Sequence, residues 1–169
     1  MSADAAAPVE DDQELIEVQI AAAGGVPAVA DLTAWAAAVL ESVPAHGCGP
    51  APAGPGELCI RLVEAAESAL LNAQYRHRDG PTNVLSFPAG VAVPGGRFWG
   101  DVVICVPRVH EEAAAQGKTP ADHFAHLVVH GVLHLLGYDH ESGAEAGTME
   151  TLERRVLDRF GIADPYGEE

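Results

Sequence analysis

The sequence predicts a single α+β domain, in which a mixed β-sheet of about four strands packs with helices. Three observations lead to this prediction. The chain has 169 residues, which fits one domain with one sizeable core. Apolar residues make up 48% of the chain, which excludes disorder of the whole. Short strand-like segments are mixed along the chain with longer segments of helical composition, as in α/β and α+β layer structures.

The first third of the chain predicts a tail, a strand, a helix and a loop. The tail is acidic and Ala-rich, and the segment after it partly alternates between apolar and polar residues, as a strand does. A Pro/Gly-rich segment then follows, which is too short to separate two domains. We expect a disordered tail at 1–13, a domain over 14–166, a strand at 14–20, a helix capped by Asp31 that runs through Trp35 to Val43, and a loop at 44–56.

The remaining two thirds predict three strands and four helices. The segment D-V-V-I-C-V is apolar enough for a central strand. Gly137 and Gly161 are placed to end the last two helices. We expect strands at 58–63, 82–88 and 101–106, and helices at 64–76, 108–116, from Pro120 to Leu136, and at 145–160.

The charge distribution excludes a broad nucleic-acid-binding face. The net charge is −16, which repels phosphate groups over most of the surface. Residues 61–110 differ from the rest, because five arginines there oppose four acidic residues, a net charge of +1. This distribution is compatible with a local phosphate site that a metal ion assists.

Neither export nor membrane insertion is indicated. The N-terminus lacks the basic and apolar regions of a secretory signal, and charges or histidines interrupt the longest apolar runs well short of a membrane span. The three cysteines, Cys48, Cys59 and Cys105, are odd in number and have no CxxC spacing. Reduced thiols in a cytoplasmic protein are the simplest interpretation.

Three histidines have the spacing of a metal site. The segment from His130 to His140 reads H-G-V-L-H-L-L-G-Y-D-H, and His130 and His134 are four residues apart on an expected helix, so their imidazoles share one face. Gly137 permits a turn that returns His140 as a third ligand. Three neutral imidazoles suit Zn²⁺ and leave a fourth position for a water molecule, whose pKa can fall to about 7. We therefore predict one zinc ion per chain.

Some polar residues near these histidines have more than one interpretation. His126 lies one turn before His130 and is either a further ligand, a group that supports one, or a partly buried helix histidine. Asp139 either orients an imidazole or caps the turn. His123 is expected to be solvated near the start of the helix.

The same spacing, H-x-x-x-H-x-x-G-x-x-H, occurs in metzincin proteases. Those enzymes carry a Glu after the first histidine as general base, whereas this chain has Gly131. Without that carboxylate, peptide hydrolysis lacks its usual proton acceptor. Met149 is compatible with the Met-turn of these proteases, but it lies in a helical segment and is expected in the core. A metalloprotease therefore remains the second interpretation.

The histidine segment closely resembles the signature of the bacterial YbeY endoribonucleases, also called rRNA maturation factors. Residues 71–88 resemble a second signature of that family, residues 99–105 resemble its G-D-I-x-I strand, and residues 149–166 resemble its C-terminal helix. The resemblance covers about 58–166, with a weaker match at 14–43.

This resemblance implies a single-strand-specific, zinc-dependent endoribonuclease that acts in 3′-end maturation of small-subunit (16S) rRNA and in ribosome quality control. It implies single-stranded RNA, ribosomal RNA and the small ribosomal subunit as partners, and neither DNA nor a membrane. The zinc ligands would be His130, His134 and His140, and the catalytic residues Arg76 and His130. Arg78 stands where the family frequently has Lys, which keeps the charge.

Arg76 also suits this chemistry independently of any family. Phosphodiester cleavage builds negative charge on non-bridging oxygens, two of which a guanidinium can bind at once. The simpler interpretation is a solvated residue at a helix end. Ser86 and Asp101 are candidates for supporting roles, or for turn and strand-cap roles.

A third interpretation of the function, beside an endoribonuclease and a metalloprotease, is a ribosome-assembly factor without activity, whose zinc site is closed and structural.

Overall fold

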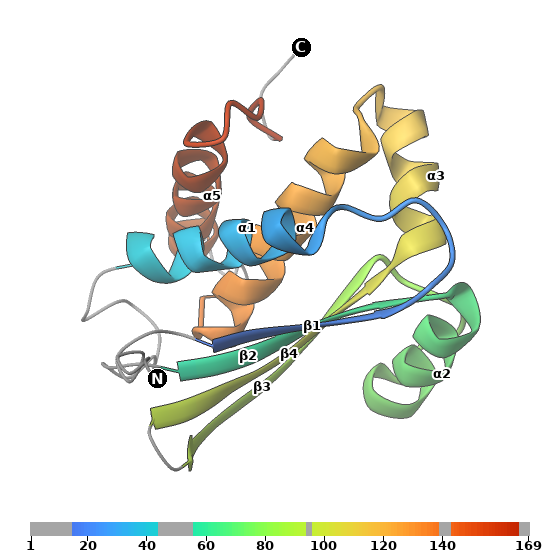
Figure 1. Cartoon of the computed structure of the whole chain (residues 1–169), viewed down its shortest axis with the longest axis horizontal. Coiled ribbons are helices and arrows are strands. Elements are labelled where there is room, and N and C mark those ends of the chain that lie inside the picture. Colours follow the sequence, from blue (N-terminus) through green and yellow to red (C-terminus); the bar gives the residue numbers. More distant parts are fainter. Residues whose placement is uncertain (1–14, 44–55, 94–95, 139–142, 166–169) are drawn as a thin grey trace, which may run out of the picture.

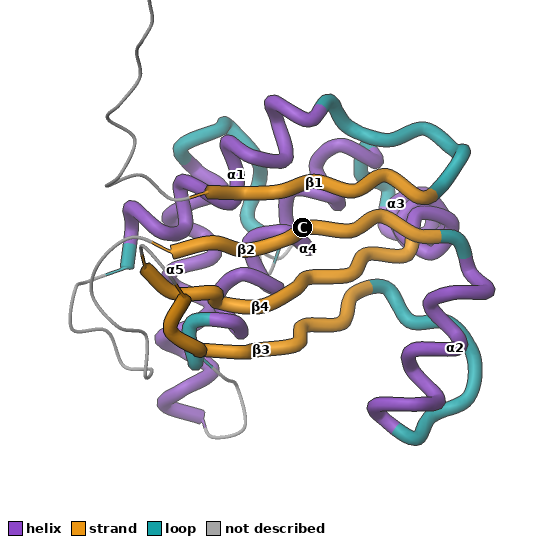
Figure 2. The backbone as a smooth tube through the Cα atoms, turned by 60° about the horizontal axis from the view of Figure 1, so that its bottom comes forward, coloured by secondary structure: helices purple, strands orange, loops and turns teal. Residues whose placement is uncertain are grey.

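The chain forms a four-stranded mixed sheet with helices on both faces (Figures 1 and 2). The computed structural model describes residues 15–43, 56–93, 96–138 and 143–165. Its strands are β1 (Leu15–Ala21), β2 (Gly56–Val63), β3 (Val84–Val93) and β4 (Gly96–Cys105). Its helices are α1 (Val29–Ser42), α2 (Ala65–Arg76), α3 (Val106–Gln116), α4 (Pro120–Leu135) and α5 (Gly143–Asp158). The predicted α+β class with a mixed sheet is confirmed.

The sheet has the order β1-β2-β4-β3, which Figure 2 shows from the face opposite α1, α4 and α5. β1 and β4 run parallel to β2, and β3 pairs antiparallel with β4. Side chains alternate between the two faces of a strand, so Leu58, Ile60 and Leu62 of β2 enter the main core while Val63 faces the other way. This alternation divides the apolar residues between two clusters of unequal size.

The larger cluster lies between the sheet and α1, α4 and α5, and α4 is at its centre (Figure 1). The smaller cluster contains Val63, Leu85 and Val103, with Leu71 of α2 packed against it, so α2 covers part of the opposite face. Met149 is buried in the larger cluster, as expected. None of the helices in the described ranges is both long and apolar enough to cross a membrane.

The structure corrects several expected boundaries. The helix expected from Asp31 begins at Val29, with Ala28 as the N-cap, and Asp31 lies in the first turn. There its carboxylate favours the helix dipole instead of capping a backbone N–H. The strands expected at 82–88 and 101–106 are longer in the structure, where they form the hairpin of β3 and β4. The sequence did not indicate the added residues as strand, because they include glycines, which have a low strand propensity. The helix expected from 108 begins at Val106, since Pro107 fits the first turn of a helix.

Two predictions fall on residues that the structure does not describe. The acidic tail at 1–13 lies outside the described residues, and so does nearly all of the loop at 44–56. The division of the chain into a tail and one domain over 14–166 therefore stays a prediction.

Candidate functional site

Helix α4 is bounded by signals that place its histidines. The Thr119 side chain caps the start, where its hydroxyl oxygen accepts a hydrogen bond from the Asp122 N–H at 3.1 Å. Gly137, at a φ of 97°, follows the end of the helix, as the sequence indicates. His130 and His134 consequently lie one turn apart in the second half of the helix.

These two histidines line one pocket. Their ring centroids are 4.7 Å apart, and both side chains are half-buried. The pocket has a volume of about 280 Å³ and lies between the second half of α4, β3 and the end of α2. Its lining consists of Arg76, Val84, Leu85, Ser86, Pro88, His130 and His134. His140 and Asp139 lie outside the described residues, so the third ligand remains a prediction.

Arg76 reaches this pocket from the last turn of α2. Its guanidinium donates a hydrogen bond to the Ser86 carbonyl at 2.7 Å, and its Cζ lies 5.2 Å from the centre of the Phe87 ring. His77, in the left-handed region with a φ of 59°, ends the helix directly after Arg76. The structure therefore brings an arginine and two histidines, separated by more than 50 residues of sequence, around one cavity.

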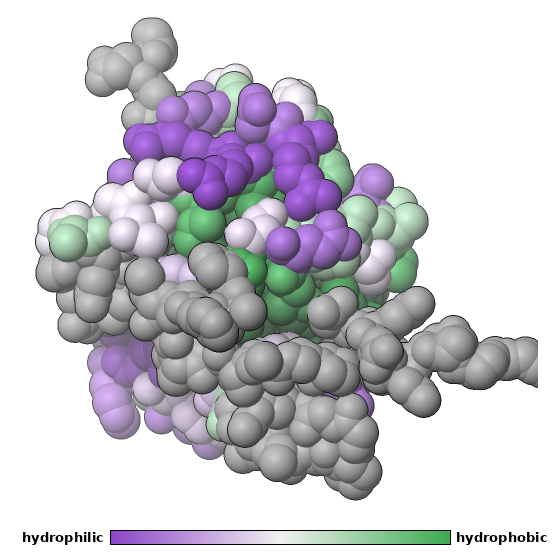
Figure 3. Space-filling model, turned by 90° about the vertical axis from the view of Figure 1, so that its left-hand side faces the viewer, coloured by the Kyte–Doolittle hydropathy of each residue, from purple (hydrophilic) through white to green (hydrophobic). Residues whose placement is uncertain are grey.

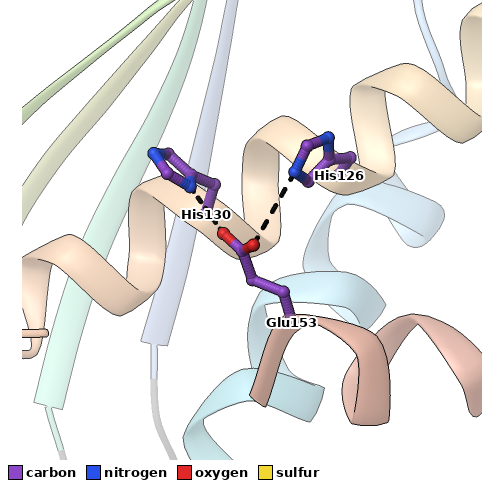
Figure 4. Close-up of side chains that lie close together, drawn as sticks. All are labelled: His126, His130 and Glu153. Atoms are coloured by element: carbon purple, nitrogen blue, oxygen red, sulfur yellow. Dashed lines mark hydrogen bonds and ion pairs between the residues drawn. The ribbon is translucent and has the colours of Figure 1, made fainter. Parts of the chain in front are cut away.

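Sequence reasoning missed Glu153, which contacts the histidines from α5 (Figure 4). Its side chain is fully buried, its Oε2 lies 2.5 Å from His130 Nδ1, and its Oε1 lies 3.8 Å from His126 Nε2. Ligand atoms of these three residues lie within 4.8 Å of one another, so this group can also be considered for a metal.

A signal for Glu153 was present in the sequence. Met149, Leu152, Val156 and Leu157 surround it at helical spacing, and all four are buried. An acidic residue in the middle of such an apolar helix face needs a polar partner.

The structure shows that the expectation for His123 is wrong. His123 is buried, with 3% of its surface exposed, and its Nε2 lies 2.8 Å from Glu112 Oε1. Burial lowers the pKa of His123, although the hydrogen bond with Glu112 opposes this effect. Packing of α4 against α3 buries this ring, and residue spacing within α4 contains no information about that contact.

Of the two candidate supporting residues, Ser86 lines the pocket and Asp101 does not. The Ser86 hydroxyl donates to the Gly131 carbonyl at 3.0 Å and so joins β3 to α4. Asp101 pairs with Cys59 and Phe87 across the sheet, and its pKa is raised by burial and then by the nearby Glu17. The structure gives Asp101 no contact with the pocket among the described residues.

Gly131 is a point of close approach between α4 and the sheet. A Cβ at this position would lie 2.6 Å from Val102 Cγ1 and 3.3 Å from Ser86 Oγ. Val102 is itself fully buried, so a shift of its side chain would disturb the closely packed core around it. The position at which a metzincin carries its general base therefore accommodates a side chain only if Val102 is displaced, which argues against the protease interpretation.

We predict that Gly131→Ala destabilises the fold, because the added methyl group overpacks the contact with Val102, by about 1–3 kcal/mol. Gly147→Ala is the matched control: Gly147 lies in α5, where an added Cβ would have nothing within 4 Å, so it should gain roughly 0.5–1 kcal/mol from helix propensity. Urea unfolding of both variants measures the difference. Equal stability of Gly131→Ala and the unaltered chain would contradict the packing argument.

Comparison with known proteins is consistent with this geometry. The family model described as Endoribonuclease YbeY matches residues 26–161. The chain belongs to the YbeY endoribonuclease family. The matched region includes α1 to α5 and therefore every described residue that lines the pocket.

Relatives named Endoribonuclease YbeY match almost the whole chain. The one from Halorhodospira halophila is 49% identical over 154 residues, covering 89% of this chain and 94% of the relative. The one from Alkalilimnicola ehrlichii is 52% identical over 157 residues, covering 89% and 90%. The solution structure of a Thermotoga maritima protein superposes with a TM-score of 0.55 at 25% identity, covering 91% of this chain and all of that one.

Proposed function

We propose that this protein cleaves single-stranded RNA with the help of one metal ion, zinc by its ligand set, held by His130, His134 and His140. We further propose that the RNA is ribosomal, that cleavage serves 3′-end maturation of small-subunit (16S) rRNA and ribosome quality control, and that the protein acts in the cytoplasm on the small subunit. The observation that carries the proposal is the common pocket of Arg76, His130 and His134. Membership of the YbeY endoribonuclease family supports RNA as the substrate.

The described residues fit a metal ion. Two imidazoles with centroids 4.7 Å apart present nitrogen donors to one cavity, and neutral imidazole is a preferred zinc ligand. When bound, such an ion stabilises charge on a phosphate group and lowers the pKa of water. His130 and His134 would hold this ion at the pocket.

Arg76 supplies the second positive group. The Ser86 carbonyl and the face of Phe87 hold its guanidinium at the pocket. Because the side chain is already ordered, phosphate binding costs less conformational entropy. The remaining N–H groups of the planar fork can donate to two non-bridging oxygens of one phosphate. Arg76 thus binds and stabilises the charge that builds up as the phosphodiester bond breaks.

An aromatic pair next to Arg76 supports single strands as substrate. Tyr75 is 51% exposed and packs edge-on against Phe87, with ring centroids 5.3 Å apart. Unpaired bases stack on exposed aromatic rings, while bases in a duplex are already stacked and paired. The 2′-hydroxyl of RNA can also serve as an internal nucleophile, which removes the need for a protein carboxylate at Gly131.

The test is a cleavage assay with the metal-loaded full chain and with the chelator-treated chain. We expect cutting of single-stranded RNA by the loaded protein, little cutting of duplex RNA, and no hydrolysis of casein-derived peptides. Chelation should abolish the activity, and added zinc should restore it. Faster hydrolysis of peptides than of RNA would favour a metalloprotease. Binding of small ribosomal subunits without any cleavage would favour an assembly factor with structural zinc.

A further inference from the structure

The fully buried carboxylate of Glu153 requires an explanation. An ionised carboxylate without partners costs several kcal/mol when it is transferred out of water, so chains seldom place one among buried apolar residues. Glu153 is compensated by His130, whose Nδ1 lies 2.5 Å from Oε2, within hydrogen-bonding distance, and an ionised acceptor strengthens such a bond. The half-buried His126 approaches the other oxygen at 3.8 Å (Figure 4).

This hydrogen bond determines which nitrogen of His130 can ligate. An ionised carboxylate only accepts, so with Glu153 ionised the hydrogen is on His130 Nδ1, which donates it to Glu153. In a neutral imidazole the lone pair is then on Nε2. Since the same ring lines the pocket together with His134, a metal ion there would be bound through His130 Nε2.

We propose that Glu153 is a positioning residue: it holds His130 with Nδ1–H directed to α5 and Nε2 available to the pocket, so that α5 completes the metal site without contributing a ligand. This rests on the proposed metal site. Carboxylates that orient a ligating histidine in this way fix its tautomer and ring direction and raise its basicity.

The alternative is that His126, His130 and Glu153 ligate a metal themselves, and distance argues against it. Ligand atoms at about 2.0–2.2 Å from a tetrahedral zinc ion lie roughly 3.3 Å from each other. His130 Nδ1 and Glu153 Oε2 are 2.5 Å apart, which fits a hydrogen atom between them but not a metal ion. Glu153 also has no exposed surface through which an ion could enter, whereas the His130 side chain is 18% exposed and lines the pocket.

The surroundings of α5 offer a matched control. Figure 3 views the molecule from the side on which α5 lies in Figure 1, and hydrophilic side chains gather over the upper part of that face. Glu150 belongs to α5, is 35% exposed, and forms an ion pair with Arg154 at 3.8 Å. Glu150→Gln removes the same charge from the same helix without touching the histidines.

The experiment compares the full chain with Glu153→Gln, Glu153→Ala, His126→Ala and Glu150→Gln. Zinc affinity is measured by chelator competition at a temperature where circular dichroism shows each variant folded, and ¹⁵N NMR of the metal-free protein reports the His130 tautomer. We expect the unaltered chain to show hydrogen on Nδ1. Glu153→Gln should still bind one zinc ion, with an affinity about 10–100 times lower. Glu150→Gln and His126→Ala should keep the normal stoichiometry, and Glu150→Gln the normal affinity and tautomer.

Three results would overturn the proposal. If His130 of the unaltered chain carries its hydrogen on Nε2, or if Glu153→Gln leaves both affinity and tautomer unchanged, Glu153 does not position the ring. If Glu153→Gln and His126→Ala each eliminate zinc altogether, the two residues are ligands. A chain that binds no zinc at all would instead refute the proposed metal site, while the tautomer measurement would still decide the role of Glu153. Should Glu153→Ala not fold, Glu153→Gln and the unaltered chain are sufficient for both tests.

Discussion

Replacing His134 with Ala should abolish stoichiometric zinc binding, and RNA cleavage with it. Structural zinc sites bind with about 10–16 kcal/mol, so the loss of one ligand out of three or four costs about 3–5 kcal/mol, more than a hundredfold in affinity. The reason for choosing His134 is its place in the pocket, one helical turn from His130. Elemental analysis of the dialysed protein measures the effect directly.

His110→Ala is the control for this substitution. His110 lies on α3, where its Nε2 is 2.7 Å from the Gly25 carbonyl oxygen, and it does not line the pocket. We expect this variant to keep one equivalent of zinc. A full equivalent retained by His134→Ala would refute the ligand assignment, and a loss in both variants would indicate a general defect of folding.

Arg76→Ala should slow RNA cleavage about a hundredfold without removing the metal. An arginine contact made mainly to charge in the transition state contributes on the order of 3 kcal/mol, which corresponds to this factor in rate. Zinc content should equal that of the unaltered chain, because arginine does not ligate. Single-turnover rates at saturating protein separate this effect from weaker RNA binding.

Two variants sharpen the test of Arg76. Arg76→Lys keeps the charge but loses the planar guanidinium, so its cleavage rate should fall between those of the unaltered chain and Arg76→Ala. Arg78→Ala removes an equal charge from an exposed position two residues away that does not line the pocket, and we expect a much smaller loss. If Arg76→Ala and Arg78→Ala lose equal activity, Arg76 contributes only general electrostatic attraction for RNA.

Much of the architecture was predictable because its causes are local. Helix α4 begins at Pro120, which fits the first turn of a helix, and ends before Gly137, and both signals are visible within a few residues. The spacing of His130 and His134 similarly requires only the period of a helix to bring the rings together. The boundaries of α1 and of the β3–β4 hairpin were less predictable, since Val29 is a poor marker of a helix start and glycines conceal the hairpin tip.

Contacts between distant segments could not be derived in this way. Spacing within α4 leaves open whether His123 is solvated, and its burial follows from the packing of α3 and its partner Glu112. The sequence shows that Gly131 stands where a metzincin has its catalytic Glu. The structural reason for a glycine at this position is the close approach of Val102 between α4 and the sheet.

The sequence by itself therefore determined the fold class, the helix that carries the histidines, and the family through its signatures. The tertiary structure determined that Arg76 shares a pocket with these histidines and that the carboxylate of Glu153 contacts His130. The physical reason is that helix periodicity and capping act over a few residues, whereas burial and the pairing of buried polar groups depend on which segments the fold brings together.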